Sequence, residues 1–363
     1  MRRVFVLGGT KPGYHKRYLR AIETLSEIFG EVYYQYADYK DNIPFSVPSN
    51  VYQLPVKLDR NELKKRGRIT FEEKVKELFD EYGRDGYVYI LDFLRFFPLY
   101  PFTHAYKVVF ETFEYHPAGV LYSIPSYPFG KIKEWLLLPI YATMLDVSDG
   151  IVATAPRDVF PLNRKRGFSY DKVHFIPNLA ATLIPPISKN QRRQSICYGA
   201  TRKMSWKLME NVIEIWEKHG YVFDVFGGVK YDREISGKYY GFMPYEEYIR
   251  TLSQCKWVIL TNTFPGYSPN INTLWSLPNK LFDALGAGTP VMVHKSNIAI
   301  AEFVERYGVG IVYNDHVGDE LFEQAETKYD EILDNIRRNQ KYFVWNDFKE
   351  KVYKEFLIRS YAL

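Results

Sequence analysis

Short apolar runs alternate with amphipathic stretches along the whole chain. Runs rich in Val, Ile, Tyr and Phe, bounded by Gly, Pro or polar residues, predict buried strands. Apolar residues that recur every three or four positions predict helices. In the first half this pattern gives strands at 4–7, 31–36, 87–91, 107–110, 150–153 and 173–177, and helices at 18–28, 70–82 and 131–144.

The same alternation restarts after a polar stretch at 181–194 that contains two adjacent prolines. Strands are expected at 195–198, 222–226, 257–261 and 310–313, helices at 207–219, 245–253 and 298–307, and a long helical region at about 319–358. Strands that alternate with helices form parallel sheets covered on both faces. We therefore expect an α/β protein with two Rossmann-like domains in series, residues 1–180 and 195–340, joined by a linker at 181–194 and followed by a last helix at 341–363.

Composition agrees with a folded two-domain protein. The chain has 363 residues, of which 46% are hydrophobic and 25% charged, and this is too long for one ordinary core. The net charge of +5 lies mostly in the first half. Such a mild excess suits an anionic acceptor or an anionic bilayer surface. It is too weak for a nucleic-acid-binding face, and no nucleic-acid-binding module is recognisable.

The two cysteines, Cys197 and Cys255, offer no metal-binding spacing and no disulfide framework. We expect them to be buried free thiols in a reducing cytosol. The first apolar run is too short for a signal peptide. The longest run, 135–145, is about half the ~20 residues that a membrane crossing needs. The sequence therefore predicts a cytoplasmic protein without a membrane span.

The most informative stretch is residues 277–293, Leu-Pro-Asn-Lys-Leu-Phe-Asp-Ala-Leu-Gly-Ala-Gly-Thr-Pro-Val-Met-Val. A short helix carries Lys280 and Asp283, Gly286 and Gly288 end it, and a strand follows at once. This order places a cation and a carboxylate at the carboxyl edge of a parallel sheet, where α/β folds bind ligands.

Two further loops carry candidate chemistry. Residues 8–13 hold glycines after the first strand, but the Lys-Ser/Thr pair of a P-loop and the Gly-x-Gly-x-x-Gly pattern are absent, which argues against an NTPase and a dinucleotide enzyme. This loop is either a plain tight turn or a ligand-facing loop; in the second case Gly9, Lys11 and His15 are acceptor-side candidates.

The loop after Gly199 carries the adjacent cations Arg202 and Lys203. It is either a solvated basic loop or a binding site for a diphosphate, to which arginine donates forked hydrogen bonds. The segment at 277–293 favours the second interpretation, because both would meet at one sheet edge.

Several segments together resemble a known family. Residues 277–293 resemble the nucleotide-sugar-binding segment of GT-B glycosyltransferases, and residues 174–178, His-Phe-Ile-Pro-Asn, resemble the element that ends the first domain in glycosyltransferase family four. Residues 240–249 resemble the family's Gly-x-x-Pro-x-x-x-Leu element, residues 107–117 its amino-domain motif, and Trp345 with the last helix its carboxyl-terminal tail. These matches follow the family's order along the whole chain.

The resemblance implies a GT-B fold: two Rossmann-like domains facing each other across a cleft, with the carboxyl-terminal helix returning to the amino-terminal domain. It implies transfer of a sugar from a nucleoside diphosphate to a glycan, lipid-linked or small-molecule acceptor, with retention of configuration, in cell-envelope or polysaccharide biosynthesis. Cofactor and metal ion are not expected, since the chain has no Asp-x-Asp. The sequence does not decide between a UDP and a GDP donor.

The resemblance also assigns roles to residues. Asp283 would accept hydrogen bonds from the ribose hydroxyls. The phosphates would be held by Arg202, Lys203 and Lys280, and the loop at 241–244 would flank the base. The whole expected donor set is Gly199, Arg202, Lys203, Gly228, Phe242, Pro244, Pro278, Asn279, Lys280, Leu281 and Asp283; the catalytic candidates on the amino-terminal side are Glu111, Glu114 and His116.

The chain also departs from the family pattern. Trp275 stands where many members have a first acid, Asp283 replaces the commoner Glu, Ala200 stands where the phosphate clamp has its arginine, and Phe113 replaces a histidine. Two alternatives therefore stay open. One is a scaffold or binding subunit of the same fold with a decayed donor site, and the other is a sugar-nucleotide epimerase.

Residues 131–145 combine Trp, Leu and cations, and residues 58–68 are highly charged. An interfacial helix needs this mixture, so the first domain is expected either to rest on an anionic membrane at its cytoplasmic face or to use these segments as a core helix and a solvated loop.

Overall fold

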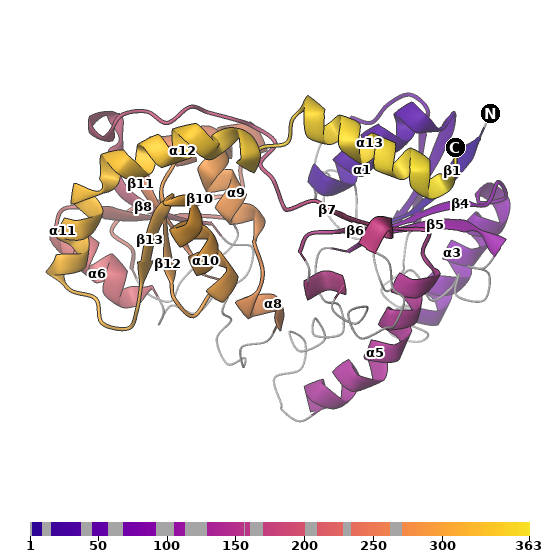
Figure 1. Cartoon of the computed structure of the whole chain (residues 1–363), viewed down its shortest axis with the longest axis horizontal. Coiled ribbons are helices and arrows are strands. Elements are labelled where there is room, and N and C mark those ends of the chain that lie inside the picture. Colours follow the sequence, from indigo (N-terminus) through magenta and orange to yellow (C-terminus); the bar gives the residue numbers. More distant parts are fainter. Residues whose placement is uncertain are drawn as a thin grey trace. The chain divides into compact units, whose positions relative to one another are not determined.

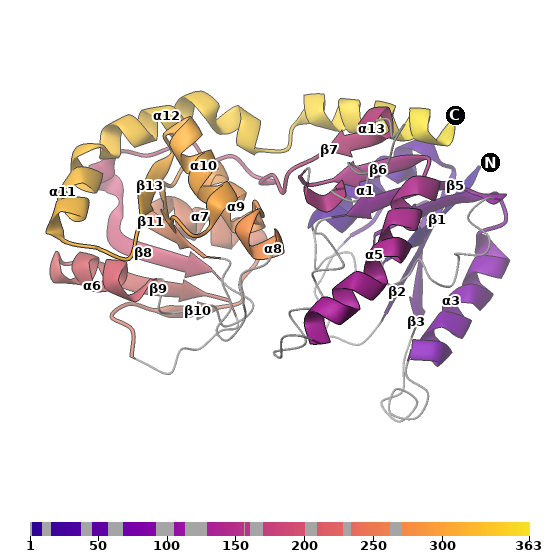
Figure 2. The ribbon, with the colours of Figure 1, turned by 60° about the horizontal axis from the view of Figure 1, so that its bottom comes forward.

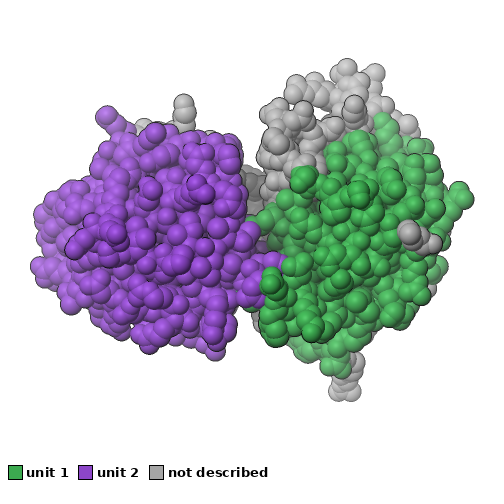
Figure 3. Space-filling view, turned by 90° about the horizontal axis from the view of Figure 1, so that it is seen from above, with its two compact units in different colours: residues 1–177, 347–363 green, residues 178–346 purple. Residues whose placement is uncertain are grey.

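The computed structural model describes residues 2–8, 16–37, 46–56, 68–91, 105–112, 129–155, 157–159, 170–199, 209–227, 234–261 and 271–363. The chain forms two compact units, which Figure 3 shows in different colours. Unit 1 consists of residues 1–177 and 347–363, and unit 2 of residues 178–346. Residues 181–194, expected as a linker, thus belong to unit 2.

Unit 1 is built on one parallel sheet of seven strands in the order β3-β2-β1-β4-β5-β6-β7. In Figure 1 its helices α1 and α13 lie on one side of the strands, and α3 and α5 on the other. The strands are β1 (Arg3–Leu7), β2 (Glu31–Ala37), β3 (Val51–Val56), β4 (Tyr87–Ile90), β5 (Lys107–Thr112), β6 (Gly150–Ala153) and β7 (Val173–Phe175), and the helices are α1 (Lys16–Ile28), α3 (Arg68–Tyr82), α5 (Phe129–Val147), the short η6 (Tyr170–Lys172) and α13 (Asp347–Tyr361).

Sequence periodicity located the central strands of unit 1 and missed strand β3. Strands β1 and β4 are almost wholly buried, because helices cover both faces, and they read as continuous apolar runs. Strand β3 lies at the edge of the sheet and contains Pro55 and the exposed Tyr52. A proline within a run argues against a central strand, but an edge strand tolerates it.

The last helix, α13, packs on unit 1, as the fold expected from the sequence requires. It lies against α1, β5 and β6. Its side chains Tyr353, Phe356 and Leu357 are buried, and the hydroxyl of Tyr361 donates to the carbonyl oxygen of Val88 at 3.0 Å. The final residues of the chain therefore complete the core of unit 1.

Unit 2 is built on a parallel sheet of six strands in the order β10-β9-β8-β11-β12-β13. Helix α12 packs against α9 and α10, and α11 packs against α6 and α12. The strands are β8 (Arg193–Gly199), β9 (Val222–Phe226), β10 (Tyr239–Gly241), β11 (Cys255–Leu260), β12 (Val291–His294) and β13 (Gly310–Tyr313), and the helices are η7 (Lys189–Gln191), α6 (Glu210–Lys218), α7 (Tyr245–Gln254), α8 (Ile271–Leu274), α9 (Asn279–Gly286), α10 (Ile298–Tyr307), α11 (Asp319–Thr327) and α12 (Tyr329–Phe343).

The two ends of unit 2 run side by side. Ala180 forms a parallel bridge with Val344: the amide of Ala180 donates to the carbonyl oxygen of Phe343 at 3.0 Å, and the amide of Trp345 donates back to Ala180 at 2.8 Å. The chain thus enters and leaves unit 2 at one place.

The helix and strand predicted within 277–293 are present as α9 and β12, and the two glycines between them have a clear packing role. A Cβ on Gly286 would lie 2.5 Å from the Cβ of Ala180 and 2.8 Å from the carbonyl oxygen of Thr182. Gly288 has φ +72°, a conformation that glycine adopts without strain. These glycines let the segment that follows Ala180 pass directly over the end of α9.

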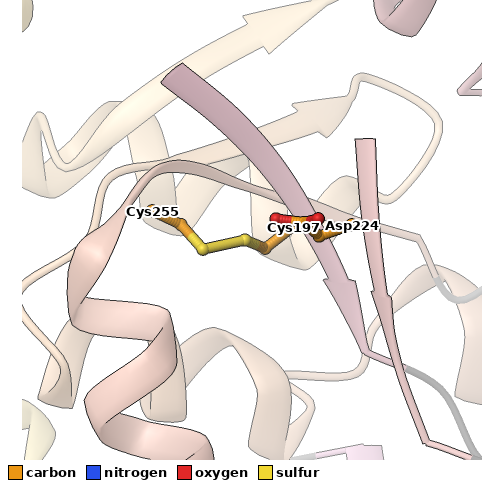
Figure 4. A group of neighbouring side chains, drawn as sticks. All are labelled: Cys197, Asp224 and Cys255. Carbon is orange, nitrogen blue, oxygen red and sulfur yellow. A yellow bond between two sulfur atoms is a disulfide. The ribbon is translucent and has the colours of Figure 1, made fainter. Parts of the chain in front are cut away.

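The expectation of free thiols is wrong for this structure: Cys197 and Cys255 form a disulfide (Figure 4). They are 58 residues apart in sequence, but β8 and β11 are neighbours in the sheet. The Cα atoms therefore lie 6.5 Å apart, within the range that a disulfide spans. The spacing of the two cysteines in the sequence did not predict this disulfide.

Among the described helices, none combines the length and the apolar character that a membrane span requires.

Candidate functional site

Described residues of the predicted donor set, among them Lys280 and Asp283, lie near the start of α9. Strands β8, β11 and β12 are neighbours and parallel, so their carboxyl ends meet at one edge of the sheet. Gly199 ends β8, Thr261 follows β11, and α9 begins after Pro278. The first amide groups of a helix have no partner within it and, with the helix dipole, favour an anion at this end.

Lys280 lies in the first turn of α9. Its ammonium Nζ is 5.0 Å from the centre of the Tyr198 ring and 3.4 Å from the carbonyl oxygen of Thr261. Burial lowers the pKa of Lys280 to about 8, because desolvation penalises its charged form. Among the residues that the structure describes, no carboxylate forms an ion pair with this ammonium. An anion bound at the start of α9 would supply the missing charge.

Asp283 follows one turn later on α9 and is buried, with 6% of its surface exposed. Its oxygen Oδ1 accepts a hydrogen bond from the hydroxyl of Tyr245 at 2.9 Å. That hydroxyl in turn accepts from the amide of Ala181 at 3.1 Å. Burial and the nearby Asp283 raise the pKa of Tyr245, so the tyrosine stays a neutral donor and holds the carboxylate in one orientation.

Tyr248 closes the other side of this cluster. A Cβ placed on Gly199 would lie 3.0 Å from its hydroxyl, so β8 ends in close contact with α7. Burial and Asp283 raise the pKa of Tyr248 as well. Sequence reasoning assigned no role to Tyr198, Tyr245 or Tyr248. The signal for the last two was their spacing of three residues on a helix that follows Pro244, which places both on one face.

The remaining described donor-side residues play different parts. Pro278 precedes α9, and Asn279 begins it at the surface. Leu281 is fully buried and packs α9 against the hydrophobic core of unit 2. Phe242 follows β10 with 74% of its surface exposed, and Pro244 stands at the start of α7. A ligand at this edge of the sheet would meet Asn279 and Phe242 before it met Leu281.

Several predicted residues lie outside the described part of the chain, and their roles stay predictions. They are Gly9, Lys11 and His15 on the acceptor side, Glu114 and His116 among the catalytic candidates, and Arg202, Lys203 and Gly228 on the donor side.

In unit 1, the candidate catalytic residue Glu111 lies near the end of β5 in a buried charged cluster. Its Oε1 accepts from the guanidinium of Arg17 at 2.6 Å and from that of Arg20 at 2.9 Å, both on α1. Its Oε2 accepts from the hydroxyl of Tyr89 on β4 at 2.5 Å. The hydroxyls of Tyr89 and Tyr353 are 2.6 Å apart. The cluster thus connects the sheet with α1 and α13.

Burial by itself would raise the pKa of the Glu111 carboxyl. Arg17, Arg20 and the hydrogen bond from Tyr89 outweigh it and hold the pKa below its usual range. Glu111 therefore stays ionised, and both of its oxygens have partners within unit 1. This arrangement gives Glu111 a structural part in seating α13; its role as a catalytic carboxylate stays a prediction.

The sequence matches a family model described as "Glycosyl transferase-like" over residues 202–349, which covers most of unit 2 and the start of α13. Comparison with curated proteins gives no match.

Solved structures match over nearly the whole chain. Sucrose-phosphate synthase from Thermosynechococcus elongatus has a TM-score of 0.66 at 14% identity, covering 99% of this chain and 98% of that one. HepE of Anabaena, in complex with UDP and glucose, has a TM-score of 0.59 at 13% identity, covering 98% and 99%. WaaG, a glycosyltransferase involved in lipopolysaccharide biosynthesis, has 0.60 at 11%, covering 97% and 98%. The chain therefore has the GT-B fold and resembles the group 1 glycosyltransferases, as its motifs indicate.

The Glu111 cluster predicts a large stability loss on removal of its charge. In Glu111→Gln, Arg17 and Arg20 keep their charges and lose the buried Glu111 carboxylate, and we expect a loss of about 3 kcal/mol or more in the free energy of unfolding, measured by urea denaturation. Glu27→Gln is the matched control, because Glu27 also joins α1 to α13, through an exposed ion pair with Lys354; its loss should stay below about 1 kcal/mol.

The pH dependence follows from the same cluster. Since the pKa of Glu111 in the folded protein lies below its unfolded value, its contribution is present near neutral pH and is lost as the pH falls through the folded pKa. Glu111→Gln should therefore unfold with a weaker acid dependence than the wild type. If Glu111→Gln and Glu27→Gln lost the same free energy of unfolding, the structural role assigned to Glu111 would be contradicted.

Proposed function

We propose that this protein is a glycosyltransferase that moves a sugar from a nucleoside diphosphate to a glycan, lipid-linked or small-molecule acceptor. The observation that carries the proposal is the start of α9, where a partly desolvated lysine without an acidic partner in the described residues and an oriented, buried carboxylate follow each other by one helical turn. A cation suits a diphosphate, and a carboxylate suits the vicinal hydroxyls of a ribose.

The chemistry requires stabilisation of a leaving diphosphate. As the bond from the anomeric carbon to the diphosphate oxygen breaks, positive charge grows on the sugar ring and negative charge on the phosphate. Lys280 and the amides at the start of α9 would stabilise that negative charge. Arg202 and Lys203 are proposed to assist from the loop after Gly199. These groups would do so without a metal ion or cofactor, and the reaction would retain the configuration of the sugar.

The similar structures support a nucleotide-sugar donor. HepE is described in complex with UDP-glucose and with UDP, and WaaG is described as part of lipopolysaccharide biosynthesis. We propose by extension a uridine diphosphate donor and a role in cell-envelope or polysaccharide biosynthesis at the cytoplasmic face of a membrane.

Two rivals make different predictions. An epimerase of the same fold would release nucleotide or form an epimer without any acceptor. A scaffold with a decayed donor site would bind no nucleotide. The hydrogen-bonded Asp283 favours the transferase over the scaffold, because burial of a carboxylate is costly and Asp283 would be dispensable in a decayed site.

Thermal shift and direct titration with UDP, GDP and ADP test the donor site. We expect Asp283→Ala to weaken binding of the preferred nucleotide by about 1–3 kcal/mol, because the ribose hydroxyls lose their acceptor. The matched control is Asp334→Ala, an exposed aspartate of the same unit paired with Arg337, which should bind as the wild type does. Unchanged nucleotide binding by Asp283→Ala would refute the role of Asp283. If the wild type bound none of the three nucleotides, the scaffold would be favoured.

Lys280 should make nucleotide binding depend on pH. Above pH 8 the free protein increasingly holds Lys280 in its neutral form, so Lys280 must take up a proton from solvent when a diphosphate binds and the ion pair forms. We expect the affinity for UDP to fall roughly tenfold between about pH 7 and pH 9. Lys280→Arg keeps its charge throughout this range and should bind with little pH dependence. An equally steep fall in Lys280→Arg would assign the effect to another group.

Helix α5 supports a second part of the proposal, contact with an anionic membrane. Ile132, Trp135 and Leu136 are 50%, 72% and 55% exposed, and their spacing of three and four places them on one face. The second half of the same helix is anchored in unit 1, where Tyr141 and Met144 are buried. Figure 2 shows the amino-terminal half of α5 extending away from the strands.

This exposed stripe, defined by Ile132, Trp135 and Leu136, has the composition of an interfacial helix. Two lysines, Lys131 and Lys133, flank Ile132 in the sequence. Apolar side chains that enter the acyl boundary and cations that meet anionic headgroups act together at a membrane surface. A membrane-bound acceptor would then be brought to the enzyme by the same contact.

Vesicle cosedimentation tests the stripe. The wild type should bind vesicles that contain phosphatidylglycerol more tightly than zwitterionic ones, and Trp135→Glu with Leu136→Glu should weaken binding at least about tenfold. Phe348→Glu is the matched control, since Phe348 is also an aromatic residue with 74% exposure on a helix of unit 1. Equal binding by the double variant and the control would remove the membrane contact from the proposal.

A further inference from the structure

Three neighbouring strands of unit 2 bring two sulfur atoms and a carboxylate together below the donor-side edge. Cys197 lies on the central strand β8, Asp224 stands directly opposite it on β9, and Cys255 begins β11. The two sulfur atoms and a carboxylate oxygen of Asp224 all lie within 4.8 Å of one another. Figure 4 shows the carboxylate beside the disulfide.

All three residues are buried: the exposed fractions of Cys197, Asp224 and Cys255 are 0%, 0% and 1%. The carboxylate of Asp224 accepts from the amide of Lys238 at 2.9 Å and forms an ion pair with Arg193 at the start of β8. Since a carboxylate has about four lone-pair positions, these two partners leave Asp224 able to accept a further bond on the side of the sulfur atoms.

We propose that reduction of the Cys197–Cys255 disulfide converts this cluster into a binding site for a thiophilic divalent cation of the Zn²⁺ class. The ligands are the two cysteine sulfurs and a carboxylate oxygen of Asp224. The site lies in the core of unit 2, so the ion is structural and takes no part in sugar transfer. The inference does not depend on the proposed function.

The reaction balances in two steps. A dithiol reductant exchanges with the disulfide, so that the Cys197–Cys255 bond breaks, each sulfur gains one electron and one proton, and the reductant leaves as its own cyclic disulfide. The cation then displaces one proton from each thiol, and two metal–sulfur bonds form while two protons enter the solvent. No other oxidant or reductant is needed.

The donor set and its charge suit such an ion. Thiolate sulfur with one carboxylate oxygen is a combination that zinc accepts, at roughly 2.3 Å and 2.0–2.2 Å. Two thiolates, Asp224 and Arg193 carry a net charge of minus two, which a divalent cation cancels. The oxidised cluster is also neutral, because Asp224 pairs with Arg193. Both states therefore avoid an uncompensated charge in the core.

A fourth, neutral donor is close at hand. Ser195 is fully buried on the same face of β8, and its hydroxyl is 3.9 Å from the sulfur of Cys197. Residues two apart on a strand point to the same side, so this hydroxyl lies on the side of β8 that carries the sulfur of Cys197. The site would then be closed to solvent, as structural zinc sites are.

The experiment compares the oxidised and reduced wild-type protein. The chain is purified anaerobically in a dithiol buffer, the dithiol is removed, and two thiols per chain are counted after denaturation. Titration with Co²⁺ should then give one equivalent per chain with thiolate-to-cobalt charge-transfer absorption, and Zn²⁺ should displace it and raise the Tm. The oxidised protein should show neither effect.

Variants locate the ligands. Asp224→Asn should weaken Co²⁺ binding by the reduced protein at least tenfold, and Cys197→Ala should abolish the charge-transfer band, whereas Asp334→Asn, an exposed aspartate of the same unit, should leave both unchanged. If Asp224→Asn does not fold, the oxidised and reduced wild type still decide the matter. A disulfide that resists the dithiol in the folded protein, or a reduced protein that binds no more metal than the oxidised one, overturns the proposal.

Discussion

The passage of the segment after Ala180 over the end of α9 is the contact on which the donor-side geometry depends. The buried side-chain amide of Gln340 donates to the carbonyl oxygens of Ile184, Leu285 and Gly286 at 2.7, 3.0 and 2.9 Å. It thereby satisfies the last carbonyls of α9 and ties them to the crossing segment. With its end fixed in this way, α9 presents Lys280 and Asp283 from a rigid element, which a site of defined geometry requires.

The two units treat buried charge differently. In unit 1, Glu111 is compensated by Arg17 and Arg20, and in unit 2 Asp224 is compensated by Arg193. In the structure as it stands, with the disulfide formed, both carboxylates have their counter-ions within the fold. Lys280 is held only by a ring and a carbonyl oxygen in the described part of the chain. A partly buried charge with no counter-ion among the described residues is a reason to look for a ligand there rather than at Glu111.

The two proposals for unit 2 concern different parts of the same sheet. The donor-side residues lie at the carboxyl ends of β8 and β11, whereas Asp224 and the two cysteines lie within the sheet. A cross-link or a bound ion that joins β8 to β11 would hold together the strands from which the donor-side loops leave. Stability of the sheet and geometry of the site are therefore linked through Cys197, which stands two residues before Gly199.

The sequence by itself determined most of the strands and helices and the position of α9, because buried strands and amphipathic helices have distinct periods and because Gly286 and Gly288 mark a helix end. It predicted one helical region at 319–358, where the structure has α11, α12 and most of α13. It missed β3 and β10, whose short or proline-containing runs at sheet edges carry little periodicity. Only the tertiary structure decided the partners of each polar group. Glu111 meets Arg17 across 94 residues of sequence, Cys197 meets Cys255 across 58, and Asp283 meets Tyr245 across 38. Such pairs depend on which strands become neighbours, and local sequence patterns do not encode that choice.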